Sequence, residues 1–470
     1  MLPDEVLLAI FDFWVDEDAL EKKEVEAWQL LVHVCQRWRS VVFGSPRRLN
    51  LRLVCGAKTP ASDTLDVWPP FPLVIRESDG RKAGHHLDNI IAVLKRSDRV
   101  CQIDLSNLDL ASTKKVLAAM QQTFAELTDL RLEGMPIAVP DSFLGGSAPR
   151  LRKLWLARIP NPFPGLPKLL LSATHLVELQ LCDIHYSKSI SLEAMVTALS
   201  TLTSLRFLGL KARFIFSGFH PHRENQLPPP RRSLLPVLNT LRYVGVSRYF
   251  DDLVVHIDAP RLNNLDIILF KQNALDTPQF INFTNCIPML EALKKAHVAF
   301  QVDGAGVKLS SQSSYGELKV KIPSRMSRLN EQLSSLQQVF TSCLPFLSMT
   351  EDLYIYENIY PRPVWPDDIE NTQWLELLHP FPAVKNLYLS KEIALCIAPA
   401  LQELVEGTTT ETLPRLQNIF LEGLQLWGPV PEGIEQFVTA RQLSGRPIAV
   451  STIPLWERDL MRGWVMEFTN

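Results

Sequence analysis

The side chains of this sequence that could do chemistry are few and scattered. His85 with His86, and His220 with His222, could each begin a metal site, but zinc sites add cysteine or carboxylate ligands at set spacings, which neither pair has nearby. We interpret them as loop or surface histidines. Residues 304–306 read Gly-Ala-Gly, which is too short for the dinucleotide-binding fingerprint, and we interpret them as a turn.

The common local motifs of catalysis are also absent from the sequence. No Walker phosphate loop, nucleophile elbow, H-E-x-x-H helix or kinase signature occurs, and these motifs mark phosphate binding, serine hydrolysis and zinc catalysis. We therefore predict no catalytic residue, no cofactor and no metal, and expect a non-catalytic protein. An enzyme whose site is assembled from distant repeats is the remaining alternative, because spatial triads leave no necessary local motif.

Composition limits the partners and the compartment. The chain has 470 residues, 46% hydrophobic and 21% charged, with a net charge of -3, which is ordinary for a folded protein and predicts no nucleic-acid partner. Seven cysteines, an odd number without paired spacing, argue against a disulfide framework. The start MLPDEVLLAIF is acidic where a secretory signal is basic, and no stretch approaches about 18 apolar residues. We expect no membrane partner and a cytoplasmic and/or nuclear protein.

The remaining function is the recognition of another protein. A repeated sequence pattern predicts the strands and helices that would position the binding residues. From about Val100 the pattern L-x-x-L-x-L recurs, with early copies spaced by the leucine-rich-repeat period, in which one strand and one helix or turn form each unit. The copies end at Leu132, Leu156, Leu181, Leu210, Val246, Ile267, Leu389 and Leu421. Residues 112–127 and 191–202 have apolar side chains at helical spacing. The sequence therefore predicts strands that alternate with helices.

The residues between the apolar positions of these strands should face the concave surface, because side chains alternate along a strand. Aromatic side chains and arginine among polar groups are typical of protein interfaces. The predicted target-binding residues are Arg131, Lys153, Trp155, Gln180, Phe207, Asp266, Tyr388 and Phe420. A plain solvated sheet face is an equal alternative, because every strand must present some side chains to water.

Two amphipathic helices are predicted before residue 53. Leu2, Leu7, Ile10 and Phe11 recur at helical spacing, and Pro3 suits a first helical turn. After an acidic linker, the segment AWQLLVHVCQRWRSVVF has the same period. So small a module cannot bury all of this apolar surface by itself, and we expect the remainder to bind a partner.

Three segments of this region, LPDEVLLAIF, VCQRWRSVVF and SPRRLNLRL, resemble the F-box in a version abundant in fungi. The linker is longer than usual, and the motif begins at Met1, which suggests truncation. The resemblance implies a helical domain that docks on Skp1, and through it on a cullin, while the downstream region binds a target protein. The residues at the motif's positions, and hence the implied Skp1 contacts, are Leu2, Pro3, Glu5, Leu8, Ile10, Phe11, Val34, Cys35, Trp38 and Val42.

The expected architecture is α/β, with an N-terminal helical F-box followed by an irregular leucine-rich-repeat-like solenoid, a curved parallel sheet backed by helices and loops. The expected segments are a docking domain at 1–53, a connection and entry to the solenoid at 54–99, a solenoid at 100–450 with insertions near 213–235, 304–316 and 360–368, and a tail or cap at 451–470. The expected function is that of a substrate adaptor in an SCF-type (Skp1, cullin, F-box) ubiquitin ligase. A protein-binding scaffold without a ligase role is the alternative.

Overall fold

All eight copies of the repeated apolar pattern form β-strands in the structure, which is a computed structural model. It describes residues 2–18, 27–46, 48–77, 87–159, 161–184, 190–212, 232–270, 278–311, 316–323, 329–358, 369–406, 412–422 and 430–453. The eight strands are β4 (Asp129–Glu133), β5 (Lys153–Ala157), β6 (Glu178–Ile184), β7 (Phe207–Ala212), β9 (Thr240–Val246), β11 (Asn264–Phe270), β16 (Asn386–Leu389) and β17 (Asn418–Leu421). The alternation of apolar residues therefore predicted these eight strands correctly.

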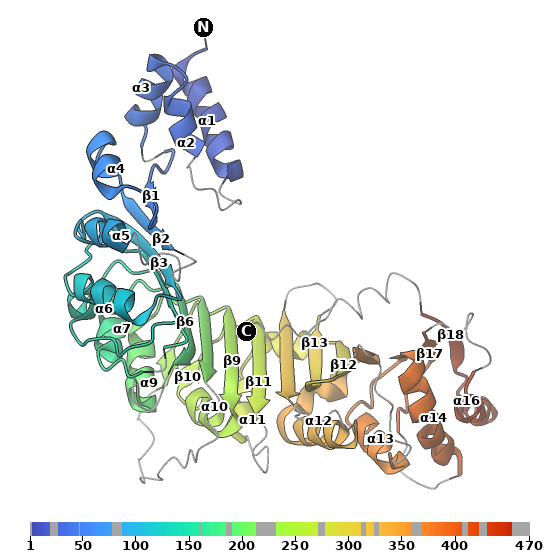
Figure 1. The fold of residues 1–470 in the computed structure, drawn as a ribbon. Coiled ribbons are helices and arrows are strands. Elements are labelled where there is room, and N and C mark those ends of the chain that lie inside the picture. The colour runs from blue at the N-terminus through green and yellow to red at the C-terminus, as the bar shows by residue number, and fades with distance from the viewer. Residues whose placement is uncertain are drawn as a thin grey trace. The chain divides into compact units, whose positions relative to one another are not determined.

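The chain is a mixed α/β protein of two compact units, Met1–Ile215 and Phe216–Asn470 (Figure 1). The sheet of the first unit is parallel, with its strands in chain order from β1 to β7. Three strands precede the repeats: β1 (Leu53–Cys55), β2 (Leu73–Glu77) and β3 (Val100–Ser106). Residues 54–99, predicted as the connection and entry to the solenoid, contain most of β1 and all of β2.

Helices cover one face of this sheet (Figure 1). They are α4 (Ala61–Val67), α5 (Leu87–Leu94), α6 (Leu110–Ala119), α7 (Leu166–Ser172) and α9 (Leu192–Thr201), with the 3-10 turn η2 (Phe143–Gly146). Helix α9 falls within the segment 191–202 that the helical spacing predicts, whereas α6 overlaps the predicted segment 112–127 only over residues 112–119. Asp109 and Ser191 cap them by accepting hydrogen bonds from the third backbone N–H of each helix.

A left-handed residue follows or interrupts the end of four successive strands of the first unit. These residues are Asn107, Gly134, Arg158 and Asp183, with φ between 51° and 68°. The next side chain is apolar and buried in each case, namely Leu108, Met135, Ile159 and Ile184. Buried apolar side chains thus recur just beyond the left-handed residue at the end of each of these four strands.

The second unit repeats the arrangement with one interruption. Its main sheet has the order β9, β11, β14, β13, β12, β15, β16, β17, β18, and a separate parallel pair joins β8 (Ser233–Leu234) and β10 (Ile257–Asp258). The strands not yet named are β12 (Lys295–Gln301), β13 (Gly304–Ser310), β14 (Glu317–Pro323), β15 (Asp352–Asn358) and β18 (Ala449–Thr452). Only β13 runs antiparallel among the paired strands described for this sheet.

Strand β13 corrects the prediction of a loop insertion near 304–316. Residues 304–310 pair on both sides, with β12 and with β14. Gly304 has φ 147°, and a side chain there would bring its Cβ within 2.2 Å of the carbonyl oxygen of Ile322. The glycines that resemble a turn in the sequence therefore allow a close approach of two strands.

Helices also cover one face of the second sheet (Figure 1). They are α10 (Ser247–Val254), α11 (Pro278–Asn285), α12 (Leu329–Cys343), α13 (Asn371–Leu378), α14 (Lys391–Glu406) and α16 (Glu432–Leu443), with the 3-10 turns η3 (Pro288–Ala292) and η4 (Pro345–Met349). Gly445, the second residue after α16, has φ 76°, the left-handed conformation that commonly ends a helix.

The N-terminal helices are α1 (Asp4–Asp18), α2 (Ala27–Val32) and α3 (Gln36–Gly44), where the sequence predicted amphipathic helices. Leu7, Phe11, Val32 and Val42 are buried among them. No helix of the described chain is long and apolar enough to span a membrane.

Several predictions fall outside the described residues. They concern the histidine pairs, residues 213–231 of the loop insertion near 213–235, the insertion near 360–368, and the tail beyond Ile453 with Trp456 and Trp464. The rest of the first insertion is described, and its residues Ser233–Leu234 form strand β8.

Candidate protein-interaction surfaces

Exposed large apolar side chains concentrate on the N-terminal helices. Among the described residues, fifteen large hydrophobic side chains are exposed, and seven of them lie in the first 34 residues. We call these seven the N-terminal apolar surface: Leu2, Val6, Ile10, Phe13, Trp14, Leu30 and Val34. Those on α1 recur every three or four residues, which places them on one side of the helix. A cluster of this kind marks an interaction site in a protein that functions in water.

The residues implied as Skp1 contacts divide by exposure. Six are exposed: Leu2, Pro3, Glu5, Ile10, Val34 and Cys35. Leu8 and Trp38 are half-buried, and the Trp38 ring packs on Phe11 at 4.8 Å between centroids. Phe11 and Val42 have no exposed surface, so they hold the helices together and do not reach a partner.

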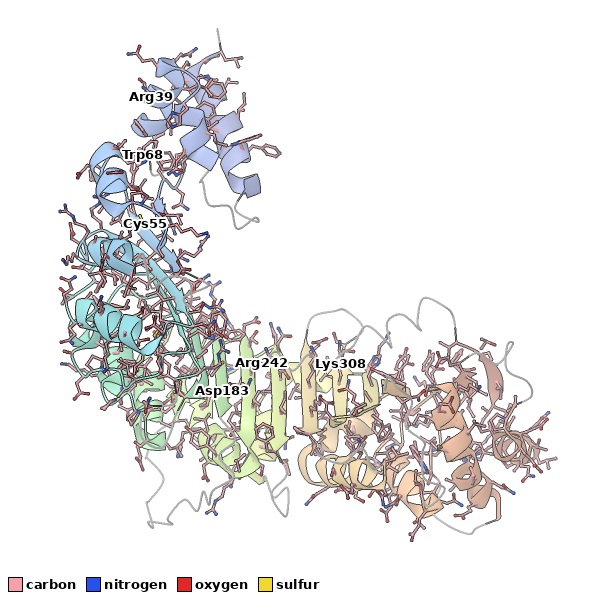
Figure 2. The ribbon with its side chains drawn as sticks, in the orientation of Figure 1. Arg39, Cys55, Trp68, Asp183, Arg242 and Lys308 are labelled. Carbon is pink, nitrogen blue, oxygen red and sulfur yellow. The ribbon has the colours of Figure 1, made fainter. Side chains whose placement is uncertain are left out.

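Buried aromatic side chains fix these helices to the start of the first sheet. The Trp28 ring lies 5.2 Å from Trp68 and 5.5 Å from Phe71, and its Nε1 donates a hydrogen bond to the backbone oxygen of Arg52 at 3.0 Å. Phe43 meets the same two rings; Trp68 is labelled in Figure 2. Residues that the sequence assigned to a separate module are therefore packed against the following strand.

The face of each sheet opposite its helices, which we call the helix-distal face, holds all eight predicted target-binding residues. In the first unit, Arg131, Trp155 and Gln180 occupy one row across β4, β5 and β6, while Lys153 and Phe207 belong to the neighbouring row. Lys153 is exposed and the others are half-buried. The strand register thus brings these five together.

Ion pairs and stacking order this face of the first unit. The Arg131 guanidinium lies 3.0 Å from the centroid of the Trp155 ring, and it pairs with Asp104 at 3.6 Å and with Glu133 at 3.0 Å. Glu133 also pairs with Arg158 at 2.8 Å. Arginine stacked on tryptophan is a common interface pair.

In the second unit, the strand register aligns a row that begins with charges and ends with aromatic rings. Across β9, β11, β14, β13, β12, β15, β16 and β17 it reads Arg242, Asp266, Lys319, Lys308, His297, Tyr354, Tyr388 and Phe420. Figure 2 labels Arg242 and Lys308 among these strands. The row contains the three remaining predicted residues, Asp266, Tyr388 and Phe420.

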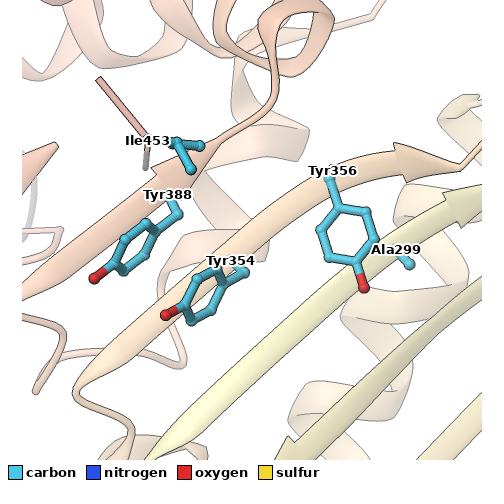
Figure 3. Packing of buried hydrophobic residues seen from close by; sticks show 5 residues of the cluster. All are labelled: Ala299, Tyr354, Tyr356, Tyr388 and Ile453. Carbon is cyan, nitrogen blue, oxygen red and sulfur yellow. The ribbon is translucent and has the colours of Figure 1, made fainter. Parts of the chain in front are cut away.

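The aromatic end of this row is a continuous stack, which we call the aromatic row. His297 lies 4.3 Å from Tyr354, Tyr354 lies 4.1 Å from Tyr388, and Tyr388 lies 4.4 Å from Phe420, all with interplanar angles below 10°. Figure 3 shows Tyr354 and Tyr388 side by side on adjacent strands. Parallel strands about 4.8 Å apart repeat side chains at a stacking distance.

Burial and neighbouring charge set the electrostatics here. Burial, with the charges of Lys308 and Lys295, lowers the pKa of His297 to about 3, so this ring is neutral at pH 7. Burial raises the pKa of Asp266, although Arg242, 3.2 Å away, opposes the rise. Burial would also raise the pKa of Glu317, but its ion pairs with Lys308 and Lys319 outweigh burial and hold it below its usual value.

Sequence reasoning missed His297, Tyr354 and Tyr356. Strands β12 and β15 do not match L-x-x-L-x-L, which was the pattern used to find strands. The segment LYIYE at 353–357 does alternate, with Leu353 and Ile355 toward the helices and the tyrosines opposite. Two-residue alternation of tyrosine with aliphatic residues was the signal that could have found them.

Other kinds of site have little support within the described ranges. They contain no group of three or more His, Cys, Asp or Glu side chains placed to hold a metal ion. A cavity beside Arg232, Val254 and Phe283 encloses about 10 Å³, about the space of a single water molecule. Compared with known proteins, the chain matches no family model, and no curated protein matches it.

Proposed function

We propose that this protein is a non-catalytic adaptor, which docks on a Skp1-like protein through its N-terminal helices and holds a target protein on the helix-distal faces. The proposal extends to a role as the substrate-recognition subunit of an SCF-type ubiquitin ligase. The observation that carries it is the N-terminal apolar surface, because seven exposed hydrophobic side chains on or next to α1 and α2 have the character of a protein interface.

The energetics favour docking through this surface. Burying one large aliphatic or aromatic side chain contributes about 1.5–3 kcal/mol, so four or five of them offset the cost of association. The packing of the buried rings of Trp28 and Phe71 with the half-buried ring of Trp68 attaches this surface to the first sheet, so a partner docked there would be held at a fixed position relative to that sheet. The adaptor would act by proximity, raising the effective concentration of target lysines beside a conjugating enzyme.

The test uses the full chain and single charge insertions. Ile10→Asp and Val34→Asp each place a carboxylate on the N-terminal apolar surface, at side chains that are 49% and 58% exposed, so neither should disturb the fold. Leu443→Asp, at an 85% exposed position on α16, is the matched control. With purified Skp1, gel filtration should give a one-to-one complex for the wild type and the control, and a loss of at least about 100-fold in affinity for the two variants.

Either of two results would refute the docking assignment. One is a wild-type chain that forms no complex with Skp1, and the other is a pair of variants that bind as tightly as the control. The scaffold without a ligase role would then take precedence. The packing of Trp28 against Trp68 and Phe71 supports that second function, since it is also what a helical cap on the first sheet requires.

A further inference from the structure

Five lysines gather at one edge of the second sheet, where β12, β15 and β16 begin. Because β13 runs antiparallel, its last residues and the first residues of β14 lie at the same edge. Figure 2 labels Lys308 there. We call this group the lysine edge, and none of its members is buried: Lys294, Lys295, Lys308, Lys319 and Lys385.

Two of these lysines face each other across neighbouring strands. Lys308 of β13 lies directly opposite Lys319 of β14, and like charges in such positions repel. Glu317 forms ion pairs with both lysines. Although burial opposes the change, these pairs lower the pKa of Glu317, so it is ionised at pH 7. Its single negative charge offsets only one of the two lysines.

A second carboxylate is shared in the same way. Glu351 accepts hydrogen bonds from the Nζ of Lys294 at 2.7 Å and from the Nζ of Lys385 at 2.8 Å. The hydrogen bonds from these two lysines lower the pKa of Glu351 to about 2, so it is also ionised at pH 7. Again one negative charge offsets one of two positive charges.

Lys295 has no ion pair among the described residues. Asp352 lies opposite it in the strand register, but the Oδ1 of Asp352 accepts a hydrogen bond from the Nδ2 of Asn386 at 2.7 Å. Together with burial, the charges of Lys308 and Lys295 lower the pKa of His297. Positive potential therefore extends from the lysine edge onto the first ring of the aromatic row.

The lysine edge has an excess of positive charge. Its five lysines stand against the three carboxylates just described, which leaves an excess of two. Two other ion pairs of this face are one to one, Arg242 with Asp266 and Lys321 with Asp303. The net charge of the whole chain is -3, so the positive excess is local. A local excess of one sign attracts a partner of the opposite sign.

The neighbouring side chains indicate which kind of anion fits. Single-stranded nucleic acids bind where a basic groove exposes aromatic rings for stacking, whereas Tyr354 and Tyr388 are only 5% and 7% exposed and stack on each other. Phosphate groups are commonly bound by the paired donors of arginine, and the cations here are lysines. Carboxylates fit this edge, because Glu317 and Glu351 each already lie between two of its lysines.

The width of the edge sets the length of the ligand. From β14 to β16 the sheet spans four strand spacings, which is about 19 Å at ~4.8 Å per strand. An extended chain advances ~3.3 Å per residue, so about six residues cross this distance.

We propose that the lysine edge binds an acidic segment of the target protein, which crosses the strands in extended form and places its carboxylates among the lysines. Under the proposed function, on which this rests, the segment belongs to the protein that the adaptor holds. Complementary charge supplies specificity and a fast approach. The half-buried ring of Phe420, at the end of the aromatic row, offers the target an apolar contact beside its acidic residues.

The first measurement uses the wild-type full chain and three fluorescent probes of nearly equal charge. They are hexaglutamate, the single-stranded oligonucleotide heptathymidylate, and a hexapeptide in which phosphoserine alternates with glycine. Fluorescence anisotropy at low salt should show saturable binding of hexaglutamate, about fivefold tighter than that of either other probe. Hexaglutamate that does not bind, or that binds no more tightly than one of the other probes, would overturn the proposal. This arm needs no mutation, so a failure to fold cannot obscure it.

The second measurement changes the excess charge in both directions. Lys295→Gln removes the lysine without an ion pair and should weaken hexaglutamate binding about threefold. Glu351→Gln releases two lysines and should strengthen it by about the same factor, a gain that misfolding does not produce. Lys153→Gln, at an exposed lysine of the first unit, is the matched control and should leave the affinity unchanged.

Two results of this second measurement would also overturn the proposal. One is a Lys295→Gln chain that binds hexaglutamate as tightly as the control, and the other is a Glu351→Gln chain that binds it no more tightly than the wild type. Skp1 binding is measured on the same preparations. A chain that binds Skp1 but not hexaglutamate refutes only the acidic target segment, and a chain that binds hexaglutamate but not Skp1 refutes only the docking assignment.

Discussion

The helix-distal faces of the two units have the same strand geometry and opposite character. In the first unit the row through Arg131 and Trp155 is half-buried and polar, and its charges pair with one another. In the second unit the corresponding rows hold stacked rings and buried side chains, among them Val244, Ile268 and Tyr356. Parallel register therefore determines which side chains are neighbours, while their polarity determines whether the face is exposed to water or buried.

Replacement of an aromatic residue on each face should give the largest difference between the two units in the free energy of unfolding that is lost. Tyr388→Ala removes a 7% exposed ring stacked on two others, and should lower the free energy of unfolding of the second unit by about 3–4 kcal/mol. Trp155→Ala removes a half-buried ring and should cost the first unit about 1–2 kcal/mol, because water already reaches part of it. Urea unfolding of each variant measures both. Equal losses would show that the two faces are equally covered.

The pH dependence of stability should give the next largest difference between the two faces. The pKa of His297 is about 3 in the folded chain against an ordinary value of 6.5, so the folded state binds fewer protons between these values. The stability that neutral His297 contributes is therefore complete above pH 6.5 and is lost as the pH falls toward 3. Between pH 7 and pH 5 the wild type should lose about 2 kcal/mol from this group.

The variant His297→Phe isolates this effect, because it keeps a ring in the stack and removes the titration. Lys295, Lys308 and Glu317 face the same site, and they are present in both proteins and cancel in the difference. Urea unfolding at pH 5 and pH 7 should therefore show a smaller loss for the variant. Parallel pH profiles for the two proteins would contradict the burial of a neutral imidazole.

The sequence pattern predicted the strands correctly where leucine occupies their buried positions. Leu130 and Leu132 of β4 alternate with polar residues, and that alternation is the direct sign of a half-covered sheet. Strands β12 and β15 were missed because Ala296 and Val298 take leucine positions of the pattern at β12, and Thr350 and Ile355 take them at β15. Gly304 was misread, since the sequence does not distinguish a glycine in a turn from one that a neighbouring strand approaches closely.

The candidate surfaces were predictable only in part. Alternation placed Tyr388 and Phe420 on the helix-distal face, but whether a residue on that face is buried depends on segments distant in sequence. Phe11 and Ile10 adjoin on one helix, yet the first is wholly buried and the second 49% exposed. Which side of α1 packs on α3 is a tertiary property, and helical spacing alone does not fix it.

The smallest effect should come from the ion pairs of the first unit. Arg131→Met keeps an apolar side chain over the Trp155 ring and removes the pairs with Asp104 and Glu133. Because the Arg131 side chain is 39% exposed, these pairs are weak, and the variant should lose less than about 1 kcal/mol. The loss should shrink further in 1 M salt, where the screening length is about 3 Å and attraction between exposed charges is weakened beyond that distance. A loss above 2 kcal/mol that persists in salt would mean that this face too is covered, and the contrast between the two units would no longer hold.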